Sequence, residues 1–462
     1  MTETLTLDSP VTETQTVTAA LADRVAAMRL ASMPLAALTV AKQCLLDWIG
    51  VALAGRSEPL VRILLDELAP TDDPGGVAIV GHGRRARASD AVLINGAMGH
   101  ALDFDDVIMP MGHPTVPVAP VVLALAQQSG ASGASALEAF IAGVETECRI
   151  ARLLGPSHYA KGWHTTATTG AFGAAAAAAH LLGVEGEALT HAFGLAGTQA
   201  AGLKSCFGTM SKPLHPGKAA QNGLLVARLA ARGFTSDTDI LGSAQGFTAT
   251  QSTTAGPTGA LADRTQPWVV EALFKYHAAC YLTHDSIEAA NQLRSEEHIA
   301  PESIEAVSVR VPSGHLGVCN IPAPSTGLEC KFSLRMTTAL AFSGEDTFQE
   351  ALFSDATARR PDLVALRDKV NIDPTQLGRG CVVTVRLKDG RSLERTGDVS
   401  QPLRDLALQQ DKLERKFRHL TTAALGAKAD EVIGLCRTLE TLPDLDGLIA
   451  LIGATGPVRP RR

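Results

Sequence analysis

The segment from Ala167 to Leu182 constrains the fold of this chain more than any other. It consists mainly of alanine, glycine and threonine. Alanine has the highest helix propensity, and a helix that is apolar on nearly every face must be enclosed by other elements. Because its residues are too weakly hydrophobic for a membrane span, the segment predicts a buried helix at the centre of a helical domain.

Apolar residues recur at helical spacing over most of residues 17–255. Aromatic residues make up only 4% of the 462-residue chain, whereas hydrophobic residues make up 45%. That combination favours closely packed helices with small residues at their contacts over a β-sandwich. The clearest predicted helices are Leu35–Leu53, Val116–Gln127, Ala136–Leu154, Glu187–Ala201 and Ala219–Arg232.

The pattern changes after about residue 262. Ile304–Val311 and Cys381–Leu387 alternate apolar and polar residues as strands do, and Asp389-Gly390 predicts a tight turn into a further strand at Ser392–Arg395. Helical periodicity returns from about residue 405, over Leu413–Leu425 and Ala429–Leu439. We therefore predict a mostly α protein. Its parts are an all-helical domain of residues 17–262 plus 405–455, an inserted α+β domain of residues 263–404, and disordered tails at 1–16 and 456–462.

Charge and cysteine usage limit the possible partners. The net charge is −7 with both signs dispersed, and Arg459–Arg462 forms the only basic cluster, so no nucleic-acid partner is predicted. The first basic residue is Arg24 and no apolar stretch follows a basic start, so we predict a cytoplasmic protein without a membrane segment. The eight cysteines form no CxxC, which indicates reduced thiols rather than disulfides or a zinc site.

Familiar nucleotide and hydrolase motifs are missing from the sequence. It has no GxxxxGK[ST], HExxH or GxSxG. Gly81 to Ala86 reads GHGRRA, which we interpret as a turn and not as a dinucleotide site, because no βαβ pattern surrounds it. The acidic run Asp103 to Asp106 lacks the last acidic position of DDxxD, where Met109 stands, so no metal is predicted.

Histidine and lysine instead gather in four segments near predicted loop-to-helix junctions. Removing a proton next to a carboxylate needs a base at the carbon and cations or donors that stabilise the enediolate. Histidine, lysine and tyrosine suit both tasks, and helix N-termini attract carboxylates. The segments are Asn95–Asp106 continued by Gly112–Thr115, His158–Thr166, Phe207–Lys218 before a helix from Ala219, and Phe274–His284. From the residues alone, structural histidines and ordinary loop lysines remain an open alternative.

Five longer stretches in this order resemble the MmgE/PrpD family over about residues 17–450. They read NGAMGHALDFDD, GHPTVPVAPVVLALA, HYAKGWHTTATTGAFGAAAAAA, FGTMSKPLHPGKAAQNGLLVARLAARGFT and TGLECKFSLR. The family includes 2-methylcitrate dehydratase, cis-aconitate decarboxylase and iminodisuccinate epimerase. The resemblance implies a helical domain with an inserted α+β lid, a homodimer, no metal or organic cofactor, and a small polycarboxylate substrate.

The resemblance also implies roles for individual residues. Asp103 would orient or polarise a histidine, and His113 would donate or accept a proton. His164 would lie in the pocket, and Tyr159 corresponds to a tyrosine considered as an acid or base in the epimerase. Lys212 would act as a base or as a carboxylate anchor.

Further positions would contact the substrate, and some of them depart from the family pattern. Lys275 opens the lid segment and is predicted to bind substrate together with His277. Cys280 stands where the decarboxylase has a histidine, and Val107 stands where decarboxylase-like members have threonine. Ser325 replaces an arginine found in many relatives.

These departures lead us to expect a dehydratase-like lyase that abstracts a proton next to a carboxylate. An epimerase that uses two bases is the first alternative, and it is compatible with the HYxxGWH segment. Decarboxylation of cis-aconitate is less favoured, and a non-catalytic carboxylate-binding protein is favoured least.

Overall fold

The computed structural model describes residues 15–109, 111–254, 261 and 264–454. It confirms the predicted fold class, since the chain is mostly helical with a small mixed sheet in its C-terminal part. The chain divides into two compact units, residues 1–274 with 405–462, and residues 275–404. We call them the helical unit and the α+β unit and describe each by itself. The predicted tails lie almost wholly outside the described residues.

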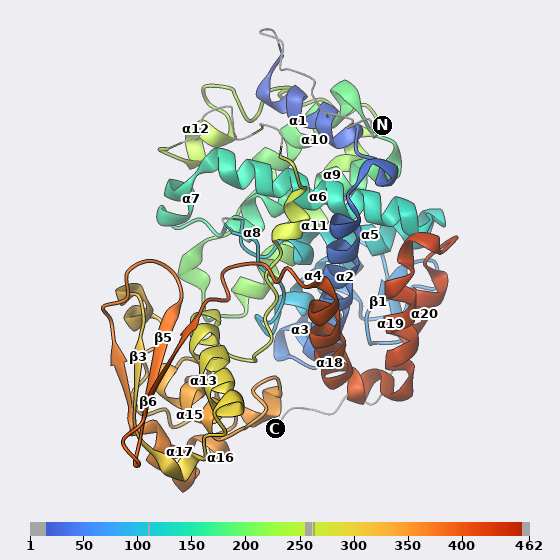
Figure 1. Cartoon of the computed structure of the whole chain (residues 1–462). Helices are drawn as coiled ribbons and strands as arrows, with labels where there is room; N and C mark the ends of the chain where they lie inside the picture. Colours follow the sequence, from blue (N-terminus) through green and yellow to red (C-terminus); the bar gives the residue numbers. More distant parts are fainter. Residues whose placement is uncertain (1–14, 110, 255–260, 262–263, 455–462) are drawn as a thin grey trace, which may run out of the picture. The chain divides into compact units, whose positions relative to one another are not determined.

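The helical unit contains long helices and one short hairpin (Figure 1). Its elements are α1 (Val17–Ala26), α2 (Leu35–Gly55), α3 (Pro59–Leu68), β1 (Val77–Ile79), β2 (Arg84–Ala86), α4 (Ala88–His100), α5 (Thr115–Ser129), α6 (Gly133–Leu154), α7 (Pro156–Ala160), α8 (Thr165–Thr168), α9 (Gly170–Leu182), α10 (Gly186–Gln199), α11 (Ser211–Ala230), α12 (Phe247–Gln251), α18 (Leu406–Leu425), α19 (Ala429–Arg437) and α20 (Asp446–Gly453).

Helix α9 is the buried centre that the alanine-rich segment predicts. All of its residues from Gly170 to Ala179 are buried, and it packs against α5, α6, α10 and α11. Small residues make these contacts close: a Cβ added at Gly223 of α11 would meet the Cβ of Ala174 at 2.4 Å. Alanine and glycine are therefore required here because larger side chains would push the helices apart.

Helix α2 joins the two sequence-distant parts of the helical unit. The C-terminal helices α18 and α19, red in Figure 1, pack against α2, in blue. The buried ammonium of Lys416 on α18 lies 2.7 Å from Asp47 of α2 and donates to the carbonyl of Phe104 at 2.8 Å.

Among the described residues, α2 alone is long and apolar enough to cross a membrane. Since 72% of its most apolar window is buried, this is weak evidence for a span.

The turn between β1 and β2 agrees with our interpretation of the glycine-rich GHGRRA segment. Gly81 and Gly83 have φ of +70° and +58°, a left-handed conformation that favours glycine. Their backbone N–H groups donate to Ile452 and Gly453 at 2.7 and 2.8 Å. The amides that a phosphate would need at this turn are thus used within the protein.

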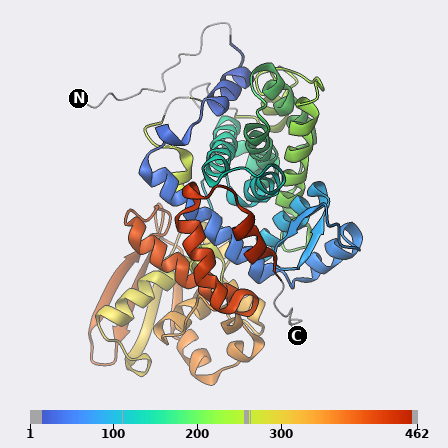
Figure 2. The same cartoon turned by 90° about the vertical axis from the view of Figure 1, so that its right-hand side faces the viewer.

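The α+β unit carries a four-stranded sheet with helices (Figure 2). Its elements are α13 (His284–Glu296), β3 (Ile304–Arg310), α14 (Gly327–Lys331), α15 (Leu334–Phe342), α16 (Asp355–Ala358), α17 (Pro361–Arg367), β4 (Val370–Asp373), β5 (Cys381–Leu387) and β6 (Ser392–Gly397). The strand order is β4-β3-β5-β6.

The sheet is mixed because β4 pairs parallel to β3, whereas β3–β5 and β5–β6 are antiparallel. The predicted turn at Asp389-Gly390 is present, with Gly390 at φ +90°. Helix α13 packs on β5 and β6, and it approaches so closely that a Cβ added at Gly397 would meet the carbonyl oxygen of Asp285 at 2.1 Å.

Two of the four histidine- and lysine-bearing segments differ from the predicted loop-to-helix junctions. Asn95 to His100 lie inside α4, where all six residues are buried. Helix α11 begins at Ser211 and not at Ala219, so Lys212 lies in its first turn. Pro213 also lies in that first turn, where a missing backbone N–H costs nothing, and Pro216 is tolerated inside the helix.

Candidate active site

A buried aspartate lies at the centre of the candidate site in the helical unit. Both carboxylate oxygens of Asp105 lie 2.9 Å from Nδ1 of His100, the last residue of α4. On its other side, Oδ2 lies 3.1 Å from Nδ1 of His113, just before α5. An ionised carboxylate only accepts hydrogen bonds, so His100 places its Nδ1 proton on Asp105, while Nδ1 of His113 lies in contact with the same carboxylate.

His113 is also close to a second carboxylate. Its Nε2 lies 3.5 Å from Oδ1 of Asp103, and the same oxygen accepts a hydrogen bond from the ammonium of Lys212 at 2.7 Å. Helix α11 brings Lys212 here because α4 and α11 touch through glycine: a Cβ added at Gly96 would meet the Cα of Gly217 at 2.7 Å. An imidazole, a carboxylate and an ammonium thus lie next to one another.

The backbone around His113 is unusual in two places. Asp103 is half exposed and has φ +51°, a conformation that is rare and strained for residues other than glycine. Gly112 has φ +102°, and a Cβ at that position would meet Oγ1 of Thr166 at 2.6 Å. The same hydroxyl accepts from the backbone N–H of His113 at 3.1 Å. These features constrain the backbone at Asp103, Gly112 and His113.

His164, at the start of α8, forms a second imidazole pair. Its Nδ1 lies 3.0 Å from Nδ1 of His215 on α11, so one ring donates and the other accepts. Its ring stacks with His100 at a centroid distance of 6.1 Å and meets Phe207 edge-on at 4.9 Å. The ring contact with His100 thus places His164 beside the group around Asp105.

Tyr159 lies in α7 and is 46% exposed. The ammonium of Lys204 lies 3.5 Å from the centre of its ring and donates to its carbonyl at 3.0 Å. Partial burial and the charge of Asp103 raise the pKa of Tyr159 above its usual value. The phenol therefore stays protonated at neutral pH and is available as a proton donor.

The charges of the group follow from its burial and pairing. Burial alone would raise the pKa of Asp105, but His100 and His113 lower it well below its usual value. Burial lowers the pKa of His100 to about 4 and also lowers that of His164. At neutral pH the centre of the site is an ionised Asp105 beside the neutral imidazole of His100.

Four of these residues could hold a metal ion. His100, Asp103, Asp105 and His113 each offer a donor atom, and the four atoms lie within 4.8 Å of one another. Imidazole and carboxylate suit divalent transition metals. The ammonium of Lys212 already lies against Asp103, so a metal would have to displace it. Our prediction that no metal is needed stays a prediction.

The site residues predicted in the α+β unit have partners of their own. His277 is buried, with Nδ1 at 2.8 Å from the hydroxyl of Thr347 and Nε2 at 3.3 Å from Glu288. Lys275 is also buried, and the thiol of Cys280 is partly exposed. His284, beside His277, is buried and pairs with the carbonyl of Ala279 at 3.1 Å.

Val107 and Ser325, two positions that depart from the family pattern, offer no charged group to a ligand. Val107 is 8% exposed, and its backbone pairs with Leu273. Ser325 donates from both its hydroxyl and its backbone to Glu329, at 2.8 and 2.6 Å. A valine cannot replace the hydrogen bond of a threonine, and the serine hydroxyl is used within its own unit.

Sequence reasoning missed several members of the site. His100, Asp105, Thr166 and His215 all lie within the quoted segments, yet none was assigned a role. The signal that could have found Asp105 and His100 is their joint position beside Asp103. Nothing local shows that His215 meets His164, because that contact depends on the packing of α11.

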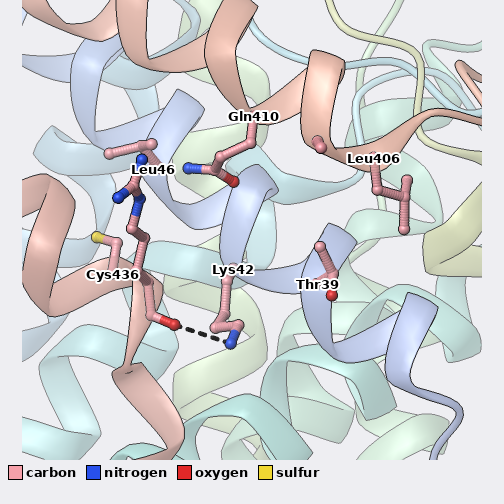
Figure 3. Close-up of a pocket in the computed structure, with 8 residues that line it drawn as sticks. Thr39, Lys42, Leu46, Leu406, Gln410 and Cys436 are labelled. Atoms are coloured by element: carbon pink, nitrogen blue, oxygen red, sulfur yellow. Dashed lines mark hydrogen bonds between the residues drawn. The ribbon is translucent and has the colours of Figure 1, made fainter.

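A cavity of about 350 Å³ lies elsewhere in the helical unit, at α2, α18 and α19 (Figure 3). Its lining residues are Thr39, Lys42, Leu46, Leu406, Ala407, Gln410, Cys436 and Arg437. The ammonium of Lys42 donates to the carbonyl of Arg437 at 2.9 Å and to Glu440 at 2.8 Å. Burial raises the pKa of the Cys436 thiol to about 12. The lining offers no paired acid and base, so we place the chemistry at Asp105 and its partners.

Two family models and several named relatives match this chain. The MmgE/PrpD N-terminal domain matches residues 19–259, and the MmgE/PrpD C-terminal domain matches residues 277–439. The human protein named cis-aconitate decarboxylase is 28% identical over 79% of this chain and 80% of its own length. Cis-aconitate decarboxylase of Aspergillus terreus is 26% identical over 91% of this chain and 92% of its own length. A cis-aconitate decarboxylase-like protein of Aspergillus oryzae is 26% identical over 94% and 97%.

Proposed function

The chain belongs to the MmgE/PrpD family, and from this premise we propose that it is a dehydratase-like lyase. Its substrate would be a small di- or tricarboxylate with a hydroxyl group. The reaction would remove a proton next to a carboxylate and then expel the hydroxyl as water. The observation that carries the proposal is His113, whose ring lies between Asp105 and Asp103, with Lys212 beside it.

His113 is the proposed base. In this proposal the proton of His113 lies on Nδ1, which is 3.1 Å from Asp105, and Nε2 accepts the proton of the substrate. That nitrogen faces Asp103 at 3.5 Å, which is longer than a normal hydrogen bond. A substrate carbon next to a carboxylate could thus deliver its proton to Nε2, and Asp105 would stabilise the imidazolium that forms.

Lys212 is the proposed cation for the enediolate. Proton removal moves negative charge onto the substrate carboxylate, and an ammonium in a partly buried site stabilises that charge. The Lys212 side chain is 16% exposed and lies against the half-exposed Asp103. A substrate carboxylate would replace Asp103 as its partner at little cost, because a partly exposed ion pair is worth about 0–1 kcal/mol.

Tyr159 is the candidate acid for the departing hydroxyl, and it holds its proton at neutral pH since its pKa is raised. His164 is neutral because burial lowers its pKa, and its Nδ1 lies 3.0 Å from Nδ1 of His215, so its part would be a hydrogen bond to the hydroxyl and not the transfer of a proton. Loss of a poor leaving group such as hydroxide requires a proton from an acid of this kind.

Decarboxylation is a second candidate, favoured by the relatives named cis-aconitate decarboxylase. Identities of 26–28% support the family more than the individual reaction. Val107 and Cys280 stand where the resemblance leads us to expect threonine and histidine, so two polar contacts of a decarboxylase would be altered. We therefore prefer dehydration, and epimerisation stays an alternative.

A substrate panel followed by NMR in D₂O separates these reactions. Enzyme dialysed against EDTA would be tested with 2-methylcitrate, citrate, malate, cis-aconitate and iminodisuccinate. A conjugated acid formed from a hydroxy acid supports dehydration. Release of CO₂ from cis-aconitate would contradict it in favour of decarboxylation. Deuterium uptake without net elimination would indicate an epimerase.

Replacing Lys212 tests the site itself. K212M should lower kcat by about 10²-fold or more, as expected when a group that stabilises transition-state charge is lost. Lys218 lies on the same helix and donates to Gln221 at 2.6 Å, so K218M is the matched control and should keep kcat within about twofold. Equal kcat for K212M and K218M on every accepted substrate would show that the site is wrongly placed.

The homodimer and the cytoplasmic location also stay predictions. Light scattering coupled to gel filtration measures the mass of the purified protein and tests the dimer. Fractionation of cells that express the chain tests the location.

A further inference from the structure

A buried lysine from the C-terminal part of the chain reaches the segment that carries the site carboxylates. Lys416 on α18 is 1% exposed, and its ammonium donates to the carbonyl of Phe104 at 2.8 Å. The same ammonium lies 4.0 Å from the centre of the Phe104 ring. Phe104 stands between Asp103 and Asp105 in the sequence. One side chain therefore contacts both the backbone and the ring of the residue that separates the two carboxylates.

The segment Asp103–Asp106 lies between α4 and α5, outside any helix or strand. The carbonyl that accepts from Lys416 belongs to the peptide group that links Phe104 to Asp105. A buried carbonyl needs a hydrogen-bond donor, and here the donor comes from a helix more than 300 residues further along the chain. The Asp105 carboxylate, directly after this peptide group, accepts from Nδ1 of His100 at 2.9 Å.

Lys416 is itself held by a carboxylate and by close helix packing. Oδ1 of Asp47 on α2 lies 2.7 Å from its ammonium, and both side chains are buried. A buried charge requires such a partner. The next residue, Phe417, packs so closely on α2 that a Cβ added at Gly50 would meet its ring at 3.0 Å. The ammonium of Lys416 thus has a defined place from which it contacts Phe104.

We propose that Lys416 is a positioning residue, which holds the peptide group between Phe104 and Asp105 and so places the Asp105 carboxylate for its contacts with His100 and His113. Lys416 acts through this peptide group and not through contact with substrate. Its effect on turnover rests on the proposed function, in which Asp105 supports His113 as the base. Its effect on the hydrogen bond between Asp105 and His100 does not depend on that function.

The alternative is that Lys416 only stabilises the packing of α18 on α2. Removal of Lys416 alone would leave Asp47 buried and unpaired, which is strongly destabilising. The test therefore compares D47N with K416M/D47N. D47N retains the donor to the Phe104 carbonyl, whereas methionine fills a similar space without a donor. The loss of the Asp47 charge also affects Asp106 and Cys44, but equally in both variants.

Steady-state kinetics and circular dichroism give the first measurement. The kcat of K416M/D47N should be about 10–100-fold below that of D47N, because a small displacement of a group that orients a base is costly, and KM should change by less than about threefold. Both variants should be folded. K416L/D47N is made as a second apolar replacement. If neither double variant folds while D47N does, Lys416 is a structural residue and the proposal is wrong.

Lys42 offers a matched control, because it makes the same kinds of contact between α2 and the C-terminal helices. Its ammonium donates to Glu440 at 2.8 Å and to the carbonyl of Arg437 at 2.9 Å (Figure 3). These contacts do not involve the segment Asp103–Asp106. K42M/E440Q should keep kcat within about twofold of the wild type, since a partly exposed pair contributes little. An equal loss of kcat in K42M/E440Q and K416M/D47N would contradict the proposal.

NMR of protein labelled with ¹⁵N-histidine tests the position of Asp105 without using turnover. The Nδ1 proton of His100 is identified as the signal missing from H100N, and it reports the hydrogen bond to Asp105. Its chemical shift should differ between D47N and K416M/D47N and should be unchanged in K42M/E440Q. An unchanged shift in K416M/D47N would overturn the proposal. A changed shift with unchanged kcat would support the positioning by Lys416 and contradict the proposed part of Asp105 in the reaction.

Discussion

His113 in the helical unit and His277 in the α+β unit are both held by carboxylates, but in different ways. His113 places Nδ1 on the fully buried Asp105 and keeps Nε2 beside Asp103. His277 has Thr347 on Nδ1 and the partly exposed Glu288 on Nε2. The charge of the fully buried Asp105 is screened less by solvent than that of the partly exposed Glu288, so it acts more strongly on the imidazole beside it. We therefore expect the reacting base in the first unit and at most a binding group in the second.

The largest effect is expected from Asp105. D105N replaces an acceptor with an amide that can also donate, so His113 can shift its proton to Nε2 and lose its function as a base. By analogy with carboxylates that orient catalytic histidines, kcat should fall by about 10³–10⁴-fold. Steady-state kinetics over a range of pH measures the change.

Circular dichroism must show that D105N is folded, because Asp105 is fully buried. A folded D105N with kcat within about tenfold of the wild type would remove the distinction between the two histidines. His113 would then not be the base.

A smaller effect is expected from the corresponding carboxylate of the α+β unit. E288Q keeps the hydrogen bond between His277 and Thr347, and Glu288 is partly exposed. Such a pair is worth only about 0–1 kcal/mol, and we expect His277 to bind substrate and not to react. The kcat of E288Q should therefore change by less than about threefold, and any larger change should be in KM. A loss of kcat as great as that of D105N would place His277 among the reacting groups.

The smallest effect concerns stability and involves Asp106, next to Asp105. Asp106 accepts from the hydroxyl of Thr115 at 2.6 Å, and burial raises its pKa to about 7. Its pKa in the unfolded chain is about 3.9. Between these two pKa values the folded state binds a proton that the unfolded state lacks. The free energy of unfolding therefore falls as pH rises from about 4 to 7, and above pH 7 this loss of stability is complete.

D106N removes this ionisation and retains an oxygen that can accept from Thr115. The melting temperature of D106N minus that of the wild type should therefore be a few degrees larger at pH 8 than at pH 5. Asp47, Asp105, Glu147 and Cys44 also interact with this carboxyl, so both proteins are compared at each pH. A difference that is constant between pH 5 and pH 8 would mean that Asp106 does not titrate in this range.

Much of the secondary structure could be predicted because its signals are local. Helix α2 begins at Leu35 as predicted, and β5 has the predicted bounds, since apolar periodicity marks both. Strand β4 was not predicted, because four residues paired parallel to β3 leave neither a hairpin turn nor a long alternation. The start of α11 was placed too late because Pro213 and Pro216 indicated a loop.

The candidate site was predicted only in part for a related reason. Asp103, His113, His164 and Lys212 were found from their segments, and the structure brings all of them together in the helical unit. The role of Asp105 was missed, because which of several nearby carboxylates meets an imidazole depends on the direction of each side chain.

The sequence by itself determined the residue types of the site, the helical and α+β parts, and the small residues between helices. The tertiary structure decided which of these residues meet. Close contact at Gly96 and Gly217 brings α4 and α11 together, so Lys212 reaches Asp103. Periodicity is a local property of the chain, whereas these contacts arise only when distant segments pack.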